Sequence, residues 1–239
     1  MEEEAARQGT HEPEHLLGSS PVQGGEIQEA RAFLRRADPV LARVIDASPD
    51  FQPREWLSEL PALDAFGTLV FQVIGQQLSV GATRRIFDRL RGLFGGDVPT
   101  PGQFLSASPD SLRRAGLSAR KVATLRLLAA AFVDGRLSQS QLESLSDQDI
   151  ETQLTAIPGI GPWTVQGFLI VALNRPDVVL PGDLALRKSI RRVYALGHLP
   201  TPAEVLQLAE RWRPYRSLAT AYLFQAAFDN TGQRGTEAV

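Results

Sequence analysis

The segment best suited to ligand chemistry is Pro158-Gly159-Ile160-Gly161-Pro162, which separates two predicted helices. Its two glycines widen the allowed range of φ and carry no Cβ, so a ligand can approach the backbone closely. Pro162 suits the first position of the second helix, whose N-terminal end carries partial positive charge. Backbone N–H groups at such an end can bind a phosphate without reading base sequence. A tight turn that needs glycine only for its geometry is an equally good interpretation.

Asp183 favours the functional interpretation. It follows Pro181-Gly182 and comes just before a predicted helix over 184–195. Aspartate is a preferred N-cap residue, and capping alone is its ordinary role at a helix start. A carboxylate close to a phosphate-binding turn, however, repels DNA and is poorly placed there unless it takes part in a reaction. We therefore take Asp183 as the candidate catalytic residue.

The hairpin, the acidic residue some twenty positions beyond it and the all-helical pattern around them resemble the helix-hairpin-helix DNA glycosylases, most closely the bacterial 3-methyladenine DNA glycosylase II group. The likeness covers about 63–230 and is most specific in IPGIGPWT, LPGDLALRK and RWRPYRSLATAYL. It implies that Asp183 is the catalytic aspartate. It also implies that the hairpin contacts the DNA backbone through Pro158, Gly159, Ile160, Gly161, Trp163 and Thr164.

A glutamine pair at the end of a predicted helix is the candidate wedge. In the family that the sequence resembles, this region supplies the side chain that fills the space left when a base is everted from the duplex. Alignment on Gly75 and Ser79 places that role on Gln77, with Gln76 and Leu78 as neighbours able to share it. An inserted amide could also hydrogen-bond the orphaned partner base. Adjacent glutamines at a helix end are otherwise ordinary solvated residues.

Aromatic residues near these positions are candidates for the pocket that receives an everted, electron-poor base. The resemblance assigns Trp163 and Phe224 to this pocket, with Tyr222 as a lesser candidate. Aromatic residues on amphipathic helices more often pack in the core, and for Phe224 that interpretation is at least as good. Gly167 and Leu184 occupy positions where a well-known member of the family has tyrosines, which predicts a more open pocket.

One carboxylate is enough for a substrate that is already activated. Glycosidases generally need two carboxyl groups, one of which protonates the leaving oxygen. Alkylated purines of the 3-methyladenine and 7-methylguanine type already carry positive charge, so Asp183 need only stabilise the cationic sugar and admit water. We therefore expect a monofunctional DNA glycosylase of base excision repair, an N-glycosyl hydrolase of the 3-methyladenine glycosylase II type.

Two alternatives remain open. A noncatalytic helix-hairpin-helix DNA-binding protein would keep the hairpin and the basic helix faces. A bifunctional glycosylase/lyase would, in this family, carry a lysine just after the hairpin. Trp163 holds that position here, and Lys188 matches no nucleophile position.

Composition limits which cofactors the chain could bind and which cellular compartment we expect for it. The 239-residue chain has no cysteine, which excludes the four-cysteine iron–sulfur cluster common in the endonuclease III branch of the family. His11, His15 and His198 are too scattered to indicate a metal site. We expect no cofactor, and a monovalent cation at the hairpin is compatible with this expectation. No signal peptide and no run of about 18 apolar residues occur, so we expect a cytoplasmic protein without membrane contact. We also expect a monomer.

Charge is unevenly distributed along the chain. Residues 1–30 contain seven acidic residues and one basic residue, a charge of −6 against −2 for the whole chain, so the remainder carries +4. Arg187 and Lys188 follow Asp183 closely and are the candidate phosphate contacts for double-stranded DNA containing damaged bases. Further basic residues cluster at 113–126, 191–192 and 211–216. Such clusters are otherwise ordinary solvated helix faces.

The helix signals predict an all-α protein. Residues 1–25 are predicted to form a disordered acidic tail, and 26–239 a glycosylase domain of two helical lobes with the active site in the cleft between them. Too few residues precede Leu63 for the separate β-rich domain of the glycosylase II group. Capping residues followed by proline predict helix starts at Thr100-Pro101, Ser108-Pro109 and Thr201-Pro202. Further helices are expected at 26–37, 39–47, within 64–94 as a pair, at 119–135 and at 215–229.

Overall fold

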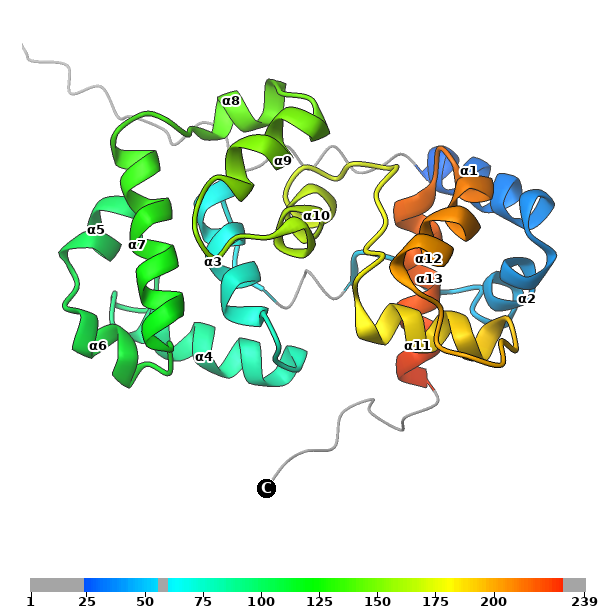
Figure 1. The fold of residues 1–239 in the computed structure, drawn as a ribbon, viewed down its shortest axis with the longest axis horizontal. Coiled ribbons are helices and arrows are strands. Elements are labelled where there is room, and N and C mark those ends of the chain that lie inside the picture. The colour runs from blue at the N-terminus through cyan, green and yellow to red at the C-terminus, as the bar shows by residue number, and fades with distance from the viewer. Residues whose placement is uncertain (1–23, 56–59, 230–239) are drawn as a thin grey trace, which may run out of the picture.

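The computed structural model describes residues 24–55 and 60–229, and all regular secondary structure in these ranges is helical. This confirms the all-α prediction. In chain order (Figure 1) the helices are α1 (Gly24–Ala37), α2 (Pro39–Ala47), α3 (Ala65–Gly75), α4 (Val80–Gly92), α5 (Pro101–Ser106), α6 (Pro109–Arg114), α7 (Ala119–Val133), α8 (Gln139–Ser144), α9 (Asp147–Thr155), α10 (Pro162–Val171), α11 (Leu184–Val193), α12 (Pro202–Ala209), the 3₁₀ turn η2 (Glu210–Trp212) and α13 (Arg216–Asp229).

Buried apolar side chains form two clusters. The larger cluster belongs to α3–α10, which we call the large lobe, and includes Phe66, Phe104 and Phe168. The second belongs to α1, α2 and α11–α13, which we call the small lobe, and includes Trp212 and Tyr222. The two groups of helices lie side by side in Figure 1. The described chain thus begins in the small lobe, builds the large lobe and returns to complete the small one.

Side-chain caps set the beginnings of several helices, as predicted. The side chains of Thr100, Ser108 and Thr201 each accept a hydrogen bond from the backbone N–H three residues on. Thr201 also forms a capping box with Glu204, whose carboxylate accepts from the Thr201 N–H at 2.6 Å. These bonds satisfy N–H groups that have no acceptor within their own helix.

An extended connection joins the two lobes between α10 and α11. Val178 is buried in the core of the large lobe, whereas Val179 and Leu180 are buried in that of the small lobe. Ser217 of α13 holds this segment, because its hydroxyl accepts from the Val178 N–H at 3.0 Å and donates to the Arg175 carbonyl at 2.6 Å. The start of α11 is therefore anchored to both cores.

Some helix ends differ from the predicted ones. α1 begins at Gly24, inside the predicted tail, and the rest of that tail, residues 1–23, lies outside the described residues. α11 ends at Val193 rather than at 195, because Tyr194 leaves the helical conformation and Ala195 has a φ of +51°. A positive φ at a residue with a Cβ is uncommon and cannot continue a right-handed helix.

Candidate active site

The turn between α9 and α10 requires glycine at position 159 for structural reasons. Gly159 has a φ of +95°, which disfavours residues with a Cβ. A Cβ there would lie 2.0 Å from Thr124 Oγ1 of α7. That hydroxyl donates a hydrogen bond to the Pro158 carbonyl at 2.9 Å and so fixes the turn against α7. The tight-turn interpretation therefore applies to Gly159.

Gly161 has no such structural need. Its backbone is extended, with a φ of −117°, and no atom beyond the adjacent residues lies within 4 Å of the place where a Cβ would be. It is the N-cap residue of α10 but provides no side-chain cap. No acceptor in the described part of the chain pairs with the N–H groups of Gly161 and Trp163. Open space beside unpaired N–H groups at a helix N-terminus is the geometry that a phosphate needs.

Asp183 is held by donors from both lobes. Its Oδ1 accepts a hydrogen bond from the Leu186 N–H at 2.9 Å, so it caps α11 as predicted. Its Oδ2 accepts a second one from Trp163 Nε1 of α10 at 2.8 Å. The residue remains partly exposed to solvent. A carboxylate oriented in this way can stabilise positive charge without first reorganising.

Trp163 links the hairpin to this carboxylate. The family resemblance predicts a role for it in the hairpin and the base pocket, but no local pattern indicates the bond to Asp183, twenty residues away. The side chain is half-buried and packs against the core of the small lobe. Because the indole donates through its edge, the faces of the ring are left to contact other groups.

The other predicted pocket residues have different surroundings. Phe224 is half-buried at the edge of the small-lobe core. Tyr222 is fully buried, so a base cannot reach its ring in this conformation, and its predicted pocket role does not fit the structure. Gly167 is also buried, and a Cβ there would lie 2.5 Å from Gln72 Oε1, so the space that we expected to be open holds the Gln72 side chain. Leu184 is 51% exposed and leaves its side of the site open.

The three candidate wedge residues at the end of α3 are held in different ways. Gln76 points inward, since its Nε2 donates to the Gly159 carbonyl at 3.0 Å and to Thr164 Oγ1 at 2.9 Å. Gln77 is exposed and has a φ of +60°, and Leu78 is 41% exposed. Gln77 and Leu78 thus stay candidate wedge side chains, whereas the Gln76 amide ties the wedge turn to the hairpin.

Lys121 of α7 holds the same turn from another side. Its ammonium donates to the carbonyls of Ile74 and Gln76, at 2.7 and 3.0 Å. Burial lowers the pKa of Lys121, because desolvation disfavours its charged form. The C-terminal end of a helix nevertheless favours a cation, and these bonds satisfy carbonyls that lack a helical partner. Lys121 was predicted only as part of a basic cluster, and the structure makes it a support for the candidate wedge.

The basic residues divide into engaged and exposed groups. Arg213 and Arg216 each form an ion pair with Asp177 at 2.7 Å, so this cluster is engaged within the protein rather than directed at a ligand. Arg187 donates through Nε to a backbone carbonyl at 2.7 Å. Lys188 is exposed, as a phosphate contact must be.

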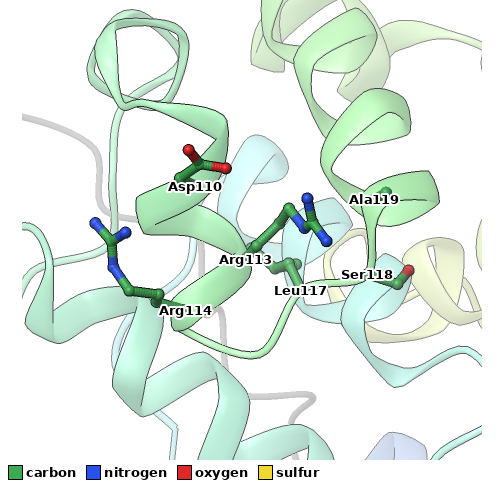
Figure 2. A pocket seen from close by; sticks show the side chains of 6 residues that line it. All are labelled: Asp110, Arg113, Arg114, Leu117, Ser118 and Ala119. Carbon is green, nitrogen blue, oxygen red and sulfur yellow. The ribbon is translucent and has the colours of Figure 1, made fainter.

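A surface pocket between α6 and α7 gathers other exposed basic side chains. Figure 2 shows Arg113 and Arg114 among its lining residues, with Ser118 just before α7. This pocket belongs to the large lobe, whereas Asp183 lies at the beginning of α11 in the small lobe (Figure 1). It is therefore separate from the candidate catalytic carboxylate.

The part of the chain that the structure describes has no group of residues suited to bind a metal and no helix suited to span a membrane. No three His, Cys, Asp or Glu side chains there are grouped so that they could hold a metal ion. None of the helices there combines the length and the apolar character needed to cross a membrane.

Comparisons with known proteins agree on one family. A family model described as "HhH-GPD superfamily base excision DNA repair protein" matches residues 70–214, which include the hairpin and Asp183. DNA-3-methyladenine glycosylase 1 of Schizosaccharomyces pombe is 30% identical over 84% of this chain and 88% of its own. DNA-3-methyladenine glycosylase 2 of Escherichia coli is 29% identical over 68% of this chain and 57% of its own. The solved S. pombe 3-methyladenine DNA glycosylase in complex with abasic DNA matches with a TM-score of 0.77 and 31% identity, covering 82% of this chain and 95% of that chain.

Proposed function

The chain belongs to the HhH-GPD superfamily of base excision DNA repair proteins, and on this basis we propose that it is a monofunctional DNA glycosylase acting on alkylated bases. It binds double-stranded DNA, everts a purine of the 3-methyladenine or 7-methylguanine type and hydrolyses the N-glycosidic bond, which leaves an abasic site. The observation that carries this proposal is the Asp183 carboxylate, fixed by Trp163 and Leu186 yet partly open to solvent.

Asp183 supplies the negative charge that the reaction needs. As the base leaves, positive charge develops on the sugar, and an anion fixed in advance stabilises it. The alkylated base already carries a positive charge and leaves as a neutral molecule, so the second carboxyl group of ordinary glycosidases is not required. Water attacks the sugar carbon and loses a proton, and a hydroxyl replaces the base.

The hairpin and the wedge turn account for the DNA contacts in this proposal. The open N–H groups of Gly161 and Trp163 hold one phosphate, and Lys188 adds a contact that does not depend on sequence. Gln77 enters the duplex where the base has left. Because Gln76 ties the wedge turn to the hairpin, both parts meet the DNA as one unit.

The everted base is received where the two lobes meet. Trp163 comes from the large lobe and Asp183 from the small lobe, and their hydrogen bond supports a site at this junction. The ring of Trp163 and that of Phe224 supply aromatic faces for an electron-poor base. In this proposal residues 26–239 form the catalytic domain, and a single copy of the chain is active.

The direct test is to incubate the protein with duplex DNA carrying alkylated, deaminated or oxidised bases and to identify each released base by mass spectrometry. We expect free 3-methyladenine and 7-methylguanine. We expect no DNA adduct trapped by borohydride, because Trp163 has no amine to form a Schiff base. A trapped adduct would indicate a bifunctional glycosylase/lyase. Duplex binding without any released base would indicate a noncatalytic DNA-binding protein.

A further inference from the structure

Gln72 of α3 has a side-chain amide that reaches the surface of the protein. The residue as a whole is 8% exposed, but its amide oxygen and nitrogen are not among the buried polar atoms that lack a partner, and no group in the described ranges pairs with them. A ligand can therefore hydrogen-bond this amide without displacing a protein group. Gln76, the C-cap residue of α3, follows four residues later, and its amide binds the Gly159 carbonyl and Thr164 Oγ1. The protein thus pairs one of these two amides and leaves the other open to solvent.

The unpaired amide faces α10 beside the candidate catalytic residues. A Cβ at Gly167 would lie 2.5 Å from Gln72 Oε1 and 3.1 Å from its Nε2, so only a residue without a Cβ leaves enough room for the amide at this position. Gly167 follows Trp163 by four residues, which puts the two positions about 40° apart around the axis of α10. Trp163 in turn donates to Asp183. The Gln72 amide is therefore one helical turn along α10 from the residue that contacts the carboxylate.

We propose that Gln72 is a specificity-determining residue whose amide hydrogen-bonds the edge of the everted base, a role that rests on the proposed glycosylase function. A primary amide offers a donor and an acceptor side by side. It fits a purine that presents an acceptor and a donor at the same spacing, as adenine does with its ring N7 and its 6-amino group. 3-Methyladenine keeps both groups, whereas 7-methylguanine carries its methyl group on N7. Gln72 thus favours 3-methyladenine over 7-methylguanine.

Replacing Gln72 by leucine removes the amide and keeps a side chain of similar size. Single-turnover excision is measured for the wild type and Gln72→Leu on duplexes containing either base. We expect the ratio of the 3-methyladenine rate to the 7-methylguanine rate to fall roughly tenfold, because a bidentate amide pair typically discriminates by about 5- to 150-fold. Affinity for an undamaged duplex should not change. Gln207→Leu, at an exposed position of α12, controls for the same chemical change away from the site.

Gly167→Ala tests the same contact from α10. Its Cβ takes the place of the Gln72 amide, so the ratio should fall in the same direction, and this variant decides the question if Gln72→Leu does not fold. Reduced thermal stability with an unchanged ratio would make Gln72 a packing residue and overturn the proposal. A wild-type protein that releases neither base would overturn the glycosylase function and this role with it, a result distinct from an unchanged ratio.

Discussion

Two aspartates of this protein share a local design and differ in their surroundings. Asp38 caps α2 and Asp183 caps α11, and each also accepts an indole N–H. The indole belongs to Trp212, at 3.0 Å from Asp38, and to Trp163, at 2.8 Å from Asp183. Asp38 is fully buried, whereas Asp183 is partly exposed. The cap and the indole bond therefore belong to the scaffold, and exposure separates the candidate catalytic carboxylate from the structural one.

Asp38 has little capacity left for chemistry. Besides the indole bond, its Oδ2 accepts from the Tyr194 hydroxyl at 2.7 Å, and its Oδ1 accepts from the N–H groups of Val40 and Leu41. Burial raises the pKa of Asp38, but the hydrogen bonds together lower it by more, so the net shift is downward. Burial raises the pKa of Tyr194, and its bond to Asp38 adds to that rise. Among the described residues Asp183 has two donors, Trp163 and Leu186, rather than four, and solvent reaches it.

The largest effect is expected for Asp183→Asn. Asparagine is also a good N-cap of similar shape, so the fold should be kept while the negative charge is lost. If that charge stabilises the transition state by about 3–4 kcal/mol, as one oxyanion-hole donor does, base release should slow roughly 10²- to 10³-fold. Single-turnover excision of 3-methyladenine, duplex affinity and thermal melting check this on both proteins. Near-native excision by a folded variant would reduce Asp183 to a structural cap like Asp38.

Asp38→Asn should have the opposite outcome. The amide nitrogen cannot accept the hydrogen bonds of Trp212 and Tyr194, so the indole N–H of Trp212 would face a donor in the core and the Tyr194 hydroxyl could only accept. We expect the free energy of unfolding to fall by about 2–3 kcal/mol, measured by chemical denaturation, with near-native excision by the folded protein. A loss of excision as large as that of Asp183→Asn, measured where the variant is fully folded, would break the comparison.

Acid should weaken the same hydrogen bonds by protonating Asp38. The resulting loss of stability should be no larger than that caused by Asp38→Asn. The pKa of Asp38 is lowered in the folded protein, so its contribution to stability is complete above the unfolded value of about 3.9 and is lost as the pH falls through the folded value. The melting temperature of the wild type should therefore decline over this acidic range, and that of Asp38→Asn should decline less steeply. Equal slopes would show that another group controls acid stability.

Local features of this protein follow from its sequence, whereas contacts between distant residues do not. Caps such as Ser146 and Thr201 are predictable, because each side chain finds its partner three residues on. Asp38-Pro39 has the same pattern of cap and proline, yet its burial depends on Trp212, which lies 174 positions away. A sequence pattern can thus locate a capping aspartate without showing whether water can reach it.

The candidate site likewise combines local features that the sequence predicts with contacts between distant residues that it does not predict. Asp183 and the hairpin stand out by residue type and spacing, but the bond from Gln76 to Gly159 spans 83 positions. Gly167 shows how residue type alone can mislead, because a missing side chain suggests open space. Here the packing of α3 against α10 fills that space with Gln72. Which side chain fills a gap depends on how two helices cross, and the periodicity of either helix does not specify the crossing.

The smallest effect is expected for Trp163→Phe. Phenylalanine keeps an aromatic face for the base but removes the N–H that holds Asp183 Oδ2. The carboxylate keeps its charge and its bond to the Leu186 N–H, so it loses orientation only. A hydrogen bond to a charged group contributes about 1.5 kcal/mol, so single-turnover excision should slow about tenfold with little change in melting temperature.

The matched variant Trp212→Phe removes the corresponding donor from Asp38, where it should lower the melting temperature and leave excision intact. A double-mutant cycle then separates the two roles that Trp163 could have. If the indole acts by holding the carboxylate, Trp163→Phe should cost nothing further in the Asp183→Asn background, because no carboxylate remains to be held. A further tenfold loss in the double variant would instead show that Trp163 acts on the base, independently of Asp183.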